Sequence, residues 1–186
     1  KAKLAKLVVL KSDFFRDIVD MEKTSLAKRS RKLFTLSAFY NACAELLGGL
    51  AIGDLEKDAK LARNFWEETA KYFPAWKQVR KGGLAASEIR EGYIHSHGVA
   101  LQSIAKAGNE LLQNKNNWQK YLKELDKIDW SRANTKLWEG RAMIGGKVSK
   151  SNINIVLTTN VIKKQWGLQL TEEEQRIEDV HLKYKR

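Results

Sequence analysis

The sequence concentrates positive charge between residues 23 and 32, in the segment KTSLAKRSRK. This segment contains five cations and no acid: Lys23, Lys28, Arg29, Arg31 and Lys32. Lysine and arginine neutralise nucleic-acid phosphates, and the interleaved serine and threonine hydroxyls can add phosphate hydrogen bonds. Many charge runs form only a solvated face. The density of this run and its lack of acids favour a segment that contacts a phosphate backbone.

A second group of cations, Arg141, Lys147 and Lys150, lies in the glycine-containing segment GRAMIGGKVSKSN. Glycine amides next to cations can cradle an anion. The segment lacks the GxxxxGK[ST] spacing of a nucleotide-binding phosphate loop. The pattern therefore predicts a second phosphate-contacting patch and argues against a nucleotide site.

His95 and His97 are the residues whose types could support metal or acid–base chemistry. On a helix, residues two positions apart point about 200° apart. The next histidine is His181, and no cysteine lies nearby, whereas a catalytic zinc usually takes three protein ligands. No motif around a serine indicates a Ser–His–Asp arrangement. We therefore expect structural histidines, no metal site, no catalytic residues and no cofactor, which makes this protein a non-enzyme.

Two further residues invite a chemical interpretation. Trp76, in the basic stretch AWKQVRK, is the best base-stacking candidate among six tryptophans, although packing in a core or interface is the commoner use of tryptophan. Cys43 lies in the apolar run FYNACAELL, and we interpret it as a small buried hydrophobic residue.

The composition limits the class of protein and its partners. The 186 residues carry 34 Lys and Arg against 22 Asp and Glu, a net charge of +12. Such a charge favours polyanionic partners, with nucleic acid first and an anionic membrane surface as the rival. A single cysteine excludes an intrachain disulfide and fits the cytoplasm. The sequence contains no run of 18 apolar residues of the kind that would indicate a membrane span.

Long segments with apolar residues at three- and four-residue steps, and a single proline, predict helices. We expect them over about 2–19, 33–47, 54–73, 75–81, 87–112 with a break near Gly92, 117–128, 151–166, and from 171 onward. Asp54 and Asn117 should cap two of them, and Thr171 with Glu174 should form a capping box. The stretch 131–151 predicts a long loop or a small hairpin. The expected fold is an all-α multi-helix bundle forming a single domain over 1–186.

Several stretches, taken together and in order, resemble one known family. They are VDMEKTSLAKRSRKLFTLSAFYNA, SEIREGYIHSHGVAL, IDWSRANTKLWEGRAMIGGKVSKSNINIVLTTNVIKK and QWGLQLTEEEQ. They are similar to the C-terminal part of the DndB family of bacterial DNA sulfur modification proteins, over about Phe14 to Glu178. The family's DGQHR motif is absent, and we expect it in an N-terminal ParB-like region outside this sequence, which would then be a fragment.

The resemblance implies a role beside the phosphorothioation system, which replaces a non-bridging phosphate oxygen of DNA with sulfur. It implies a DNA-binding transcriptional regulator of the modification operon. Two other functions stay open: a module that binds itself or other modification-system proteins, and an enzyme that uses His95 or His97. Cations clustered on one face would favour the DNA-binding regulator. A large exposed apolar patch would favour the protein-interaction module. A metal beside the histidines would favour the enzyme.

Overall fold

The computed structural model describes residues 2–185 and is predominantly helical, as the sequence predicts. Its α-helices are α1 (Ala2–Leu10), α2 (Asp13–Ile18), α3 (Leu36–Leu46), α4 (Leu55–Ala70), α5 (Pro74–Arg80), α6 (Ala86–Gly92), α7 (Gly98–Asn114), α8 (Gln119–Leu122), α9 (Thr135–Trp138), α10 (Asn152–Gln165) and α11 (Glu172–Tyr184). Two 3₁₀ turns, η1 (Ile94–Ser96) and η2 (Lys123–Lys127), and four two-residue strands complete the chain: β1 (Val19–Asp20), β2 (Phe34–Thr35), β3 (Met143–Ile144) and β4 (Lys147–Val148).

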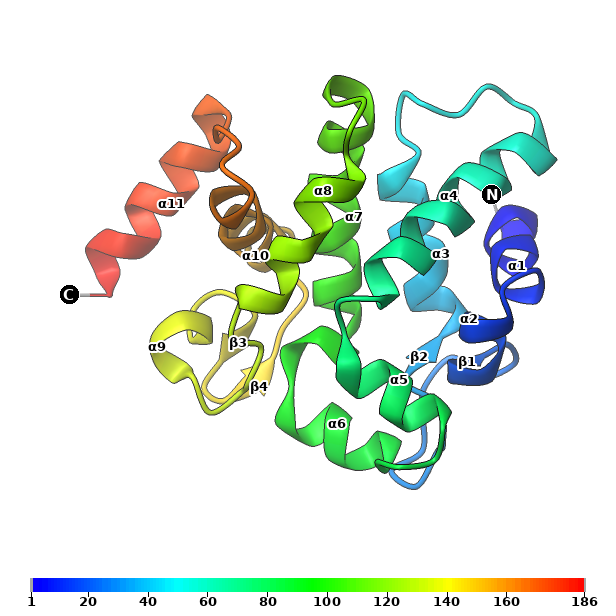
Figure 1. Cartoon of the computed structure of the whole chain (residues 1–186). Helices are drawn as coiled ribbons and strands as arrows, with labels where there is room; N and C mark the ends of the chain where they lie inside the picture. The colour runs from blue at the N-terminus through cyan, green and yellow to red at the C-terminus, as the bar shows by residue number, and fades with distance from the viewer. Residues whose placement is uncertain (1, 186) are drawn as a thin grey trace.

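Helix α7 is the centre of the bundle (Figure 1). It packs against α3 on one side and against α10 on the other, while α1 packs against both α3 and α4, and α11 lies on the outside of α10. None of the helices described is long and apolar enough to cross a membrane.

The close packing around α7 depends on Gly108. A Cβ atom at this position would lie 2.3 Å from Cζ of Phe65 and 3.2 Å from Cδ1 of Leu46. Both neighbours are fully buried, on α4 and α3 respectively. The glycine therefore lets three helices approach one another at the middle of the core.

An aromatic cluster fills the core below α7 and includes Trp76. The Trp76 ring is fully buried and stacks on Phe73, with ring centroids 4.2 Å apart. Its indole N–H donates to Nδ1 of His95 at 3.1 Å. Trp76 therefore packs in the core, as the commoner use of tryptophan predicts, and presents no face for base stacking. Cys43 is also buried, and this burial raises its pKa to about 12.

Several helix boundaries follow their local signals. The side chains of Asp54, Ser151 and Thr171 accept the expected first-turn amides, and Thr171 and Glu174 form the predicted capping box. The stretch 131–151 contains a small antiparallel hairpin, with Met143 opposite Val148 and Gly145 and Gly146 at positive φ in its turn.

Other boundaries were predicted wrongly. The segment 2–19 is two helices, because Ser12 caps a new helix by accepting the Phe15 amide at 3.2 Å. The helix expected from Leu33 begins at Leu36, where Thr35 is the cap. Asn117 caps nothing with its side chain: α8 begins after Trp118 without a side-chain cap. The helix expected over 54–73 ends at Ala70, and the next helix begins at Pro74, one residue earlier than expected. Proline suits this first position because the amide N–H that it lacks would have no partner within the helix.

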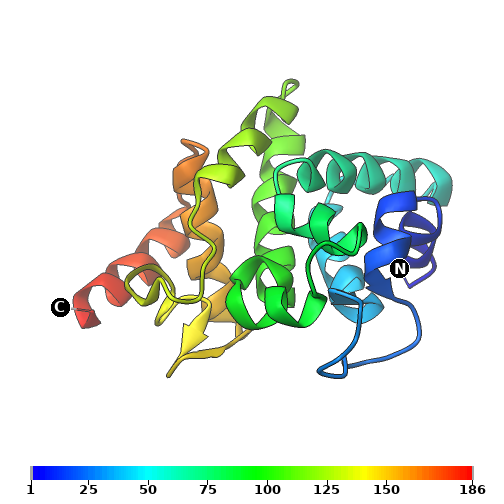
Figure 2. The same ribbon diagram turned by 60° about the horizontal axis from the view of Figure 1, so that its bottom comes forward.

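The basic segment lies in an irregular loop, residues 21–33, which we call the connector. A pair of short strands holds the two ends of the connector together. Strands β1 and β2 pair in parallel, with Val19 opposite Phe34, so the chain leaves and returns at one point. The connector and the β3–β4 hairpin lie at the same end of the bundle, on either side of α6 (Figure 2).

Candidate anion-binding site

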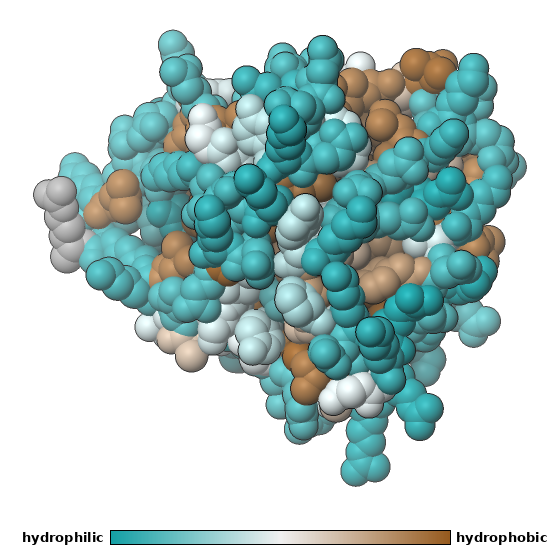
Figure 3. Space-filling model, in the orientation of Figure 1, coloured by the Kyte–Doolittle hydropathy of each residue, from teal (hydrophilic) through white to brown (hydrophobic). Residues whose placement is uncertain are grey.

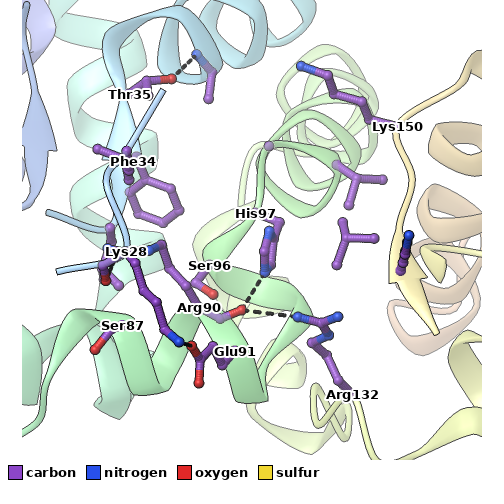
Figure 4. Close-up of a pocket in the computed structure, with 17 residues that line it drawn as sticks. Lys28, Phe34, Thr35, Ser87, Arg90, Glu91, Ser96, His97, Arg132 and Lys150 are labelled. Atoms are coloured by element: carbon purple, nitrogen blue, oxygen red, sulfur yellow. Dashed lines mark hydrogen bonds and ion pairs between the residues drawn. The ribbon is translucent and has the colours of Figure 1, made fainter. Parts of the chain in front are cut away.

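A cleft of about 640 Å³ lies between the connector, the start of α7 and the β3–β4 hairpin (Figure 4). It thus joins the two basic segments that the sequence analysis singled out. Its charged lining comprises five cations and one acid: Lys28, Arg90, Arg132, Lys147, Lys150 and Glu91. The surplus of positive charge in a concave surface favours an anion.

Arg90 of α6 holds the connector against the bundle. One guanidinium nitrogen donates to the carbonyls of Ser30 and Lys32, and the other donates to those of Ala27 and Lys28, at 3.1 and 2.9 Å. A guanidinium offers five donors in a fixed plane, which suits several carbonyls converging from one loop. Arg90 therefore shapes the connector, and its donors face the chain's own backbone.

The carbonyl of the same residue anchors the other wall. The backbone oxygen of Arg90 accepts hydrogen bonds from Nε2 of His97, 2.6 Å away, and from Nη1 of Arg132, 3.4 Å away, as the dashed lines in Figure 4 show. The second guanidinium nitrogen of Arg132 donates to the carbonyl of Gly146 in the hairpin turn at 3.0 Å. A chain of hydrogen bonds through Arg90 and Arg132 thus links the connector to the hairpin and fixes the width of the cleft.

Three lysines on the rim remain available for an anion. Lys28 extends from the connector with 86% of its side chain exposed, and its ammonium lies 3.8 Å from a carboxylate oxygen of Glu91. Lys147 and Lys150 are exposed on and beyond β4. In Figure 4, Lys28 and Lys150 lie on opposite sides of the opening. An anion that enters the cleft would therefore meet cations from both walls.

The predicted contact residues of the connector differ in what surrounds them. Lys23, Lys28, Arg29 and Arg31 are exposed on the connector, but Arg29 and Arg31 line a separate hollow beside the α5–α6 turn. Lys32 is half-buried and donates to the carbonyls of Arg16 and Asp17. Its ammonium therefore holds the connector to α2.

Arg141 must be removed from the predicted phosphate contacts. Its side chain is buried, donates to both carboxylate oxygens of Glu178, and reaches the Leu157 carbonyl at 3.1 Å. The sequence placed it beside Lys147 and Lys150, but its guanidinium points into the α10–α11 interface. Its charge is already compensated there.

The two histidines have separate structural partners. His95 is buried, and its Nδ1 accepts the Trp76 indole N–H, so this nitrogen is unprotonated. Burial, aided by His97, lowers the pKa of His95 to about 3. Burial also lowers the pKa of His97, against the opposing effect of its bond to the Arg90 carbonyl. Both rings are therefore neutral near pH 7, and within residues 2–185 no metal-ligand cluster forms around them.

A family model described as DndB, DNA-sulfur modification-associated, matches residues 1–169. This range covers most of the chain. The chain belongs to the DndB family. The resemblance seen in the sequence is thereby confirmed, and the protein is associated with DNA sulfur modification. No curated protein and no solved structure matched the chain.

Within this DndB chain, every residue of the cleft falls inside the matched range, whereas α11 lies beyond it. Sequence reasoning missed Arg90 and Arg132, which organise the cleft. Both lie in stretches that carry the family resemblance, but nothing in their local pattern distinguishes a guanidinium that binds backbone carbonyls from one that binds phosphate.

Proposed function

We propose that this DndB chain is a DNA-binding accessory protein of the phosphorothioation system and regulates transcription of the modification operon. The observation that carries the proposal is the convergence of Lys28, Lys147 and Lys150 around one cleft, from segments more than a hundred residues apart. The domain acts by binding and contributes no catalytic residues.

The rim lysines suit contact with the DNA backbone. A lysine ammonium is a compact point charge on a flexible stem, so it follows a phosphate without demanding one geometry. Contacts of this kind position a protein on DNA and are largely indifferent to base sequence. Operator choice then requires other contacts, so this surface supplies affinity and orientation.

A salt titration of DNA binding tests the proposal. Fluorescence anisotropy with a short duplex should show log affinity falling linearly with log salt, and Lys147→Ala with Lys150→Ala should reduce that slope by about 1.8, or about 0.9 per lost contact. The matched control is Lys120→Ala with Lys123→Ala. These lysines are exposed on α8 and η2 and do not line the cleft, so they should leave the slope unchanged.

Two further variants locate the edges of the surface. Glu91→Gln removes the carboxylate beside Lys28 and should tighten binding by about two- to fivefold, the range of an exposed ion pair. Arg29→Ala with Arg31→Ala tests the hollow beside the cleft and should lower the slope by about 1.8 if both contact phosphate. An unchanged slope would confine the contacts to the cleft side of the connector.

Regulation requires a second comparison, between a duplex from upstream of the modification operon and an unrelated duplex of equal length. A regulator should bind the first more tightly at the same salt concentration. Equal affinities would restrict the protein to non-specific DNA contact. If the chain binds neither duplex at low salt, DNA binding is overturned and the protein-interaction alternative takes its place. The face in Figure 3 is largely hydrophilic with scattered apolar residues, which favours the DNA proposal there.

A further inference from the structure

The cleft combines positive charge with several directional donors that are already bonded to the protein itself. Arg90 and Arg132 donate to six different backbone carbonyls between them. The Ser96 hydroxyl donates to the carbonyls of Ile89 and Tyr93, at 3.0 and 3.1 Å. Nε2 of His97 is committed to Arg90. Each of these four side chains, which commonly bind phosphate oxygens, thus already has at least one hydrogen-bond partner within the protein.

The rest of the lining is mostly apolar. It is built from the connector, β2, the first turns of α3 and α7, and β4. The residues are Leu26, Leu33, Phe34, Ala38, Val99 and Val148. The Phe34 ring and the His97 ring face the same opening in Figure 4. An ordinary phosphate oxygen that enters such a lining loses hydration without gaining a hydrogen bond, which costs free energy.

A sulfur atom in place of that oxygen suits this environment better. Sulfur is larger and more polarisable than oxygen, accepts hydrogen bonds weakly, and packs well against apolar and aromatic groups. The rim lysines still neutralise the negative charge, since an ammonium requires no particular acceptor geometry. The hydroxyls of Thr35 and Ser87 and the start of α7, which has no side-chain cap, remain for the other oxygen.

We propose that the cleft recognises a phosphorothioate linkage in DNA in preference to an ordinary phosphodiester. This inference rests on the proposed DNA-binding function and goes beyond it by naming the chemical group that the cleft takes. A volume of about 640 Å³ falls within the range of pockets that enclose small ligands. It therefore offers room for one linkage with parts of its flanking sugars.

The test uses three duplexes of one sequence, which carry at one position a phosphodiester or either diastereomer of a phosphorothioate. We expect one diastereomer to bind about fourfold more tightly than the phosphodiester, the factor for burying one methylene-sized group. The other diastereomer should bind like the phosphodiester, because the cleft fixes which non-bridging atom meets the apolar wall. An equal gain for both diastereomers would show general adhesion of sulfur to the protein and would overturn the inference.

Variants of the lining separate this inference from the proposed function. Leu26→Asn and Val148→Asn should bring the preference close to one, because an amide in the lining can donate a hydrogen bond to an ordinary phosphate oxygen. Val148→Thr keeps the side-chain shape and should reduce the preference even if the asparagine variant fails to fold. Ile153→Asn, exposed on α10 outside the cleft, is the matched control and should retain the full preference.

The possible outcomes are distinct. If wild-type protein binds all three duplexes equally and the slope still depends on Lys147 and Lys150, the inference fails and the proposed function stands. If no duplex binds at low salt, both fail. A preference that survives Leu26→Asn and Val148→Thr in folded protein would place the sulfur elsewhere and would also overturn the inference.

Discussion

A guanidinium nitrogen of Arg90 donates to the backbone carbonyl of Lys28 at 2.9 Å, across 62 residues of the chain. The bond makes the position of an exposed loop lysine depend on a residue of helix α6. It also means that the connector, which has little regular structure, is held in one conformation at the edge of the cleft.

Arg90→Lys should release the connector without changing the net charge. One ammonium cannot reach four carbonyls in the plane of a guanidinium. We expect amide exchange over residues 27–32 to accelerate and the free energy of unfolding to fall by about 2 kcal/mol, as for hydrogen bonds to a charged group. Hydrogen exchange with mass spectrometry measures the first effect. Arg29→Lys, in the exposed part of the same segment, is the control and should leave exchange unchanged.

The features that the sequence predicted correctly are local ones. Asp54 and Thr171 each cap the helix that follows directly, so a few neighbouring residues determine the outcome. The helix break at Ser12 was missed although its cap is also local. Apolar residues continue at helical steps from α1 into α2, and this continuous pattern hides the cap between them.

The organisation of the cleft could not be predicted in this way. Whether Arg90 binds phosphate or a loop depends on residues about 60 positions away, and whether Arg141 is exposed depends on Glu178, 37 positions away. Such pairings are decided by tertiary packing. The sequence therefore identified both basic segments, but not which cations in them are already compensated.

The packing of α7 against α4 predicts that Gly108→Ala destabilises the protein. Alanine improves intrinsic helix propensity by about 1 kcal/mol, but its methyl group would lie 2.3 Å from buried Phe65, and overpacking typically costs about 1–3 kcal/mol. We expect a net loss of up to about 2 kcal/mol. Gly92→Ala is the matched control, since a Cβ there meets no atom within 4 Å. Chemical denaturation should show a lower free energy of unfolding for Gly108→Ala, and a higher or unchanged one for Gly92→Ala. Equal losses in the two variants would contradict the packing argument.

His95 predicts how stability depends on pH. Its folded pKa of about 3 lies below its ordinary value of 6.5, so between these values the unfolded chain binds a proton that the folded chain does not. Stability should therefore fall as the pH drops from about 6.5 toward 3. His95→Gln should reduce the slope of unfolding free energy against pH between 6.5 and 4.5, although burial lowers the pKa values of His97 and His181 too. A slope identical to that of wild type would mean that His95 is not held neutral.

The ion pair between Arg141 and Glu178 gives the sharpest test of a corrected assignment. Nη1 of Arg141 lies 2.8 Å from Oε2 of Glu178, and Glu178 also accepts bonds from Asn160 and Lys164. Burial alone would raise the pKa of Glu178, but these donors, led by Arg141, outweigh it and lower the pKa to about 2. Glu178 should therefore be ionised at neutral pH, and the ion pair with Arg141 should stay charged.

Glu178→Leu should destabilise the protein by about 3–5 kcal/mol, because it leaves the Arg141 charge buried without a partner. Adding Arg141→Met should recover most of that loss, since apolar residues often replace a buried ion pair at little cost. The same cycle at Arg176 and Glu173, an exposed pair on the same helix, should show no measurable coupling.

DNA binding by the double variant Arg141→Met/Glu178→Leu then decides the role of Arg141. The two substitutions leave the net charge of the protein unchanged, so a general charge effect is absent. If Arg141 compensates Glu178, the folded double variant binds DNA with the wild-type salt slope, whereas Lys147→Ala in the same background lowers it by about 0.9. A double variant whose own slope has already fallen by about 0.9 would return Arg141 to the phosphate contacts and would imply that α11 moves aside when DNA binds.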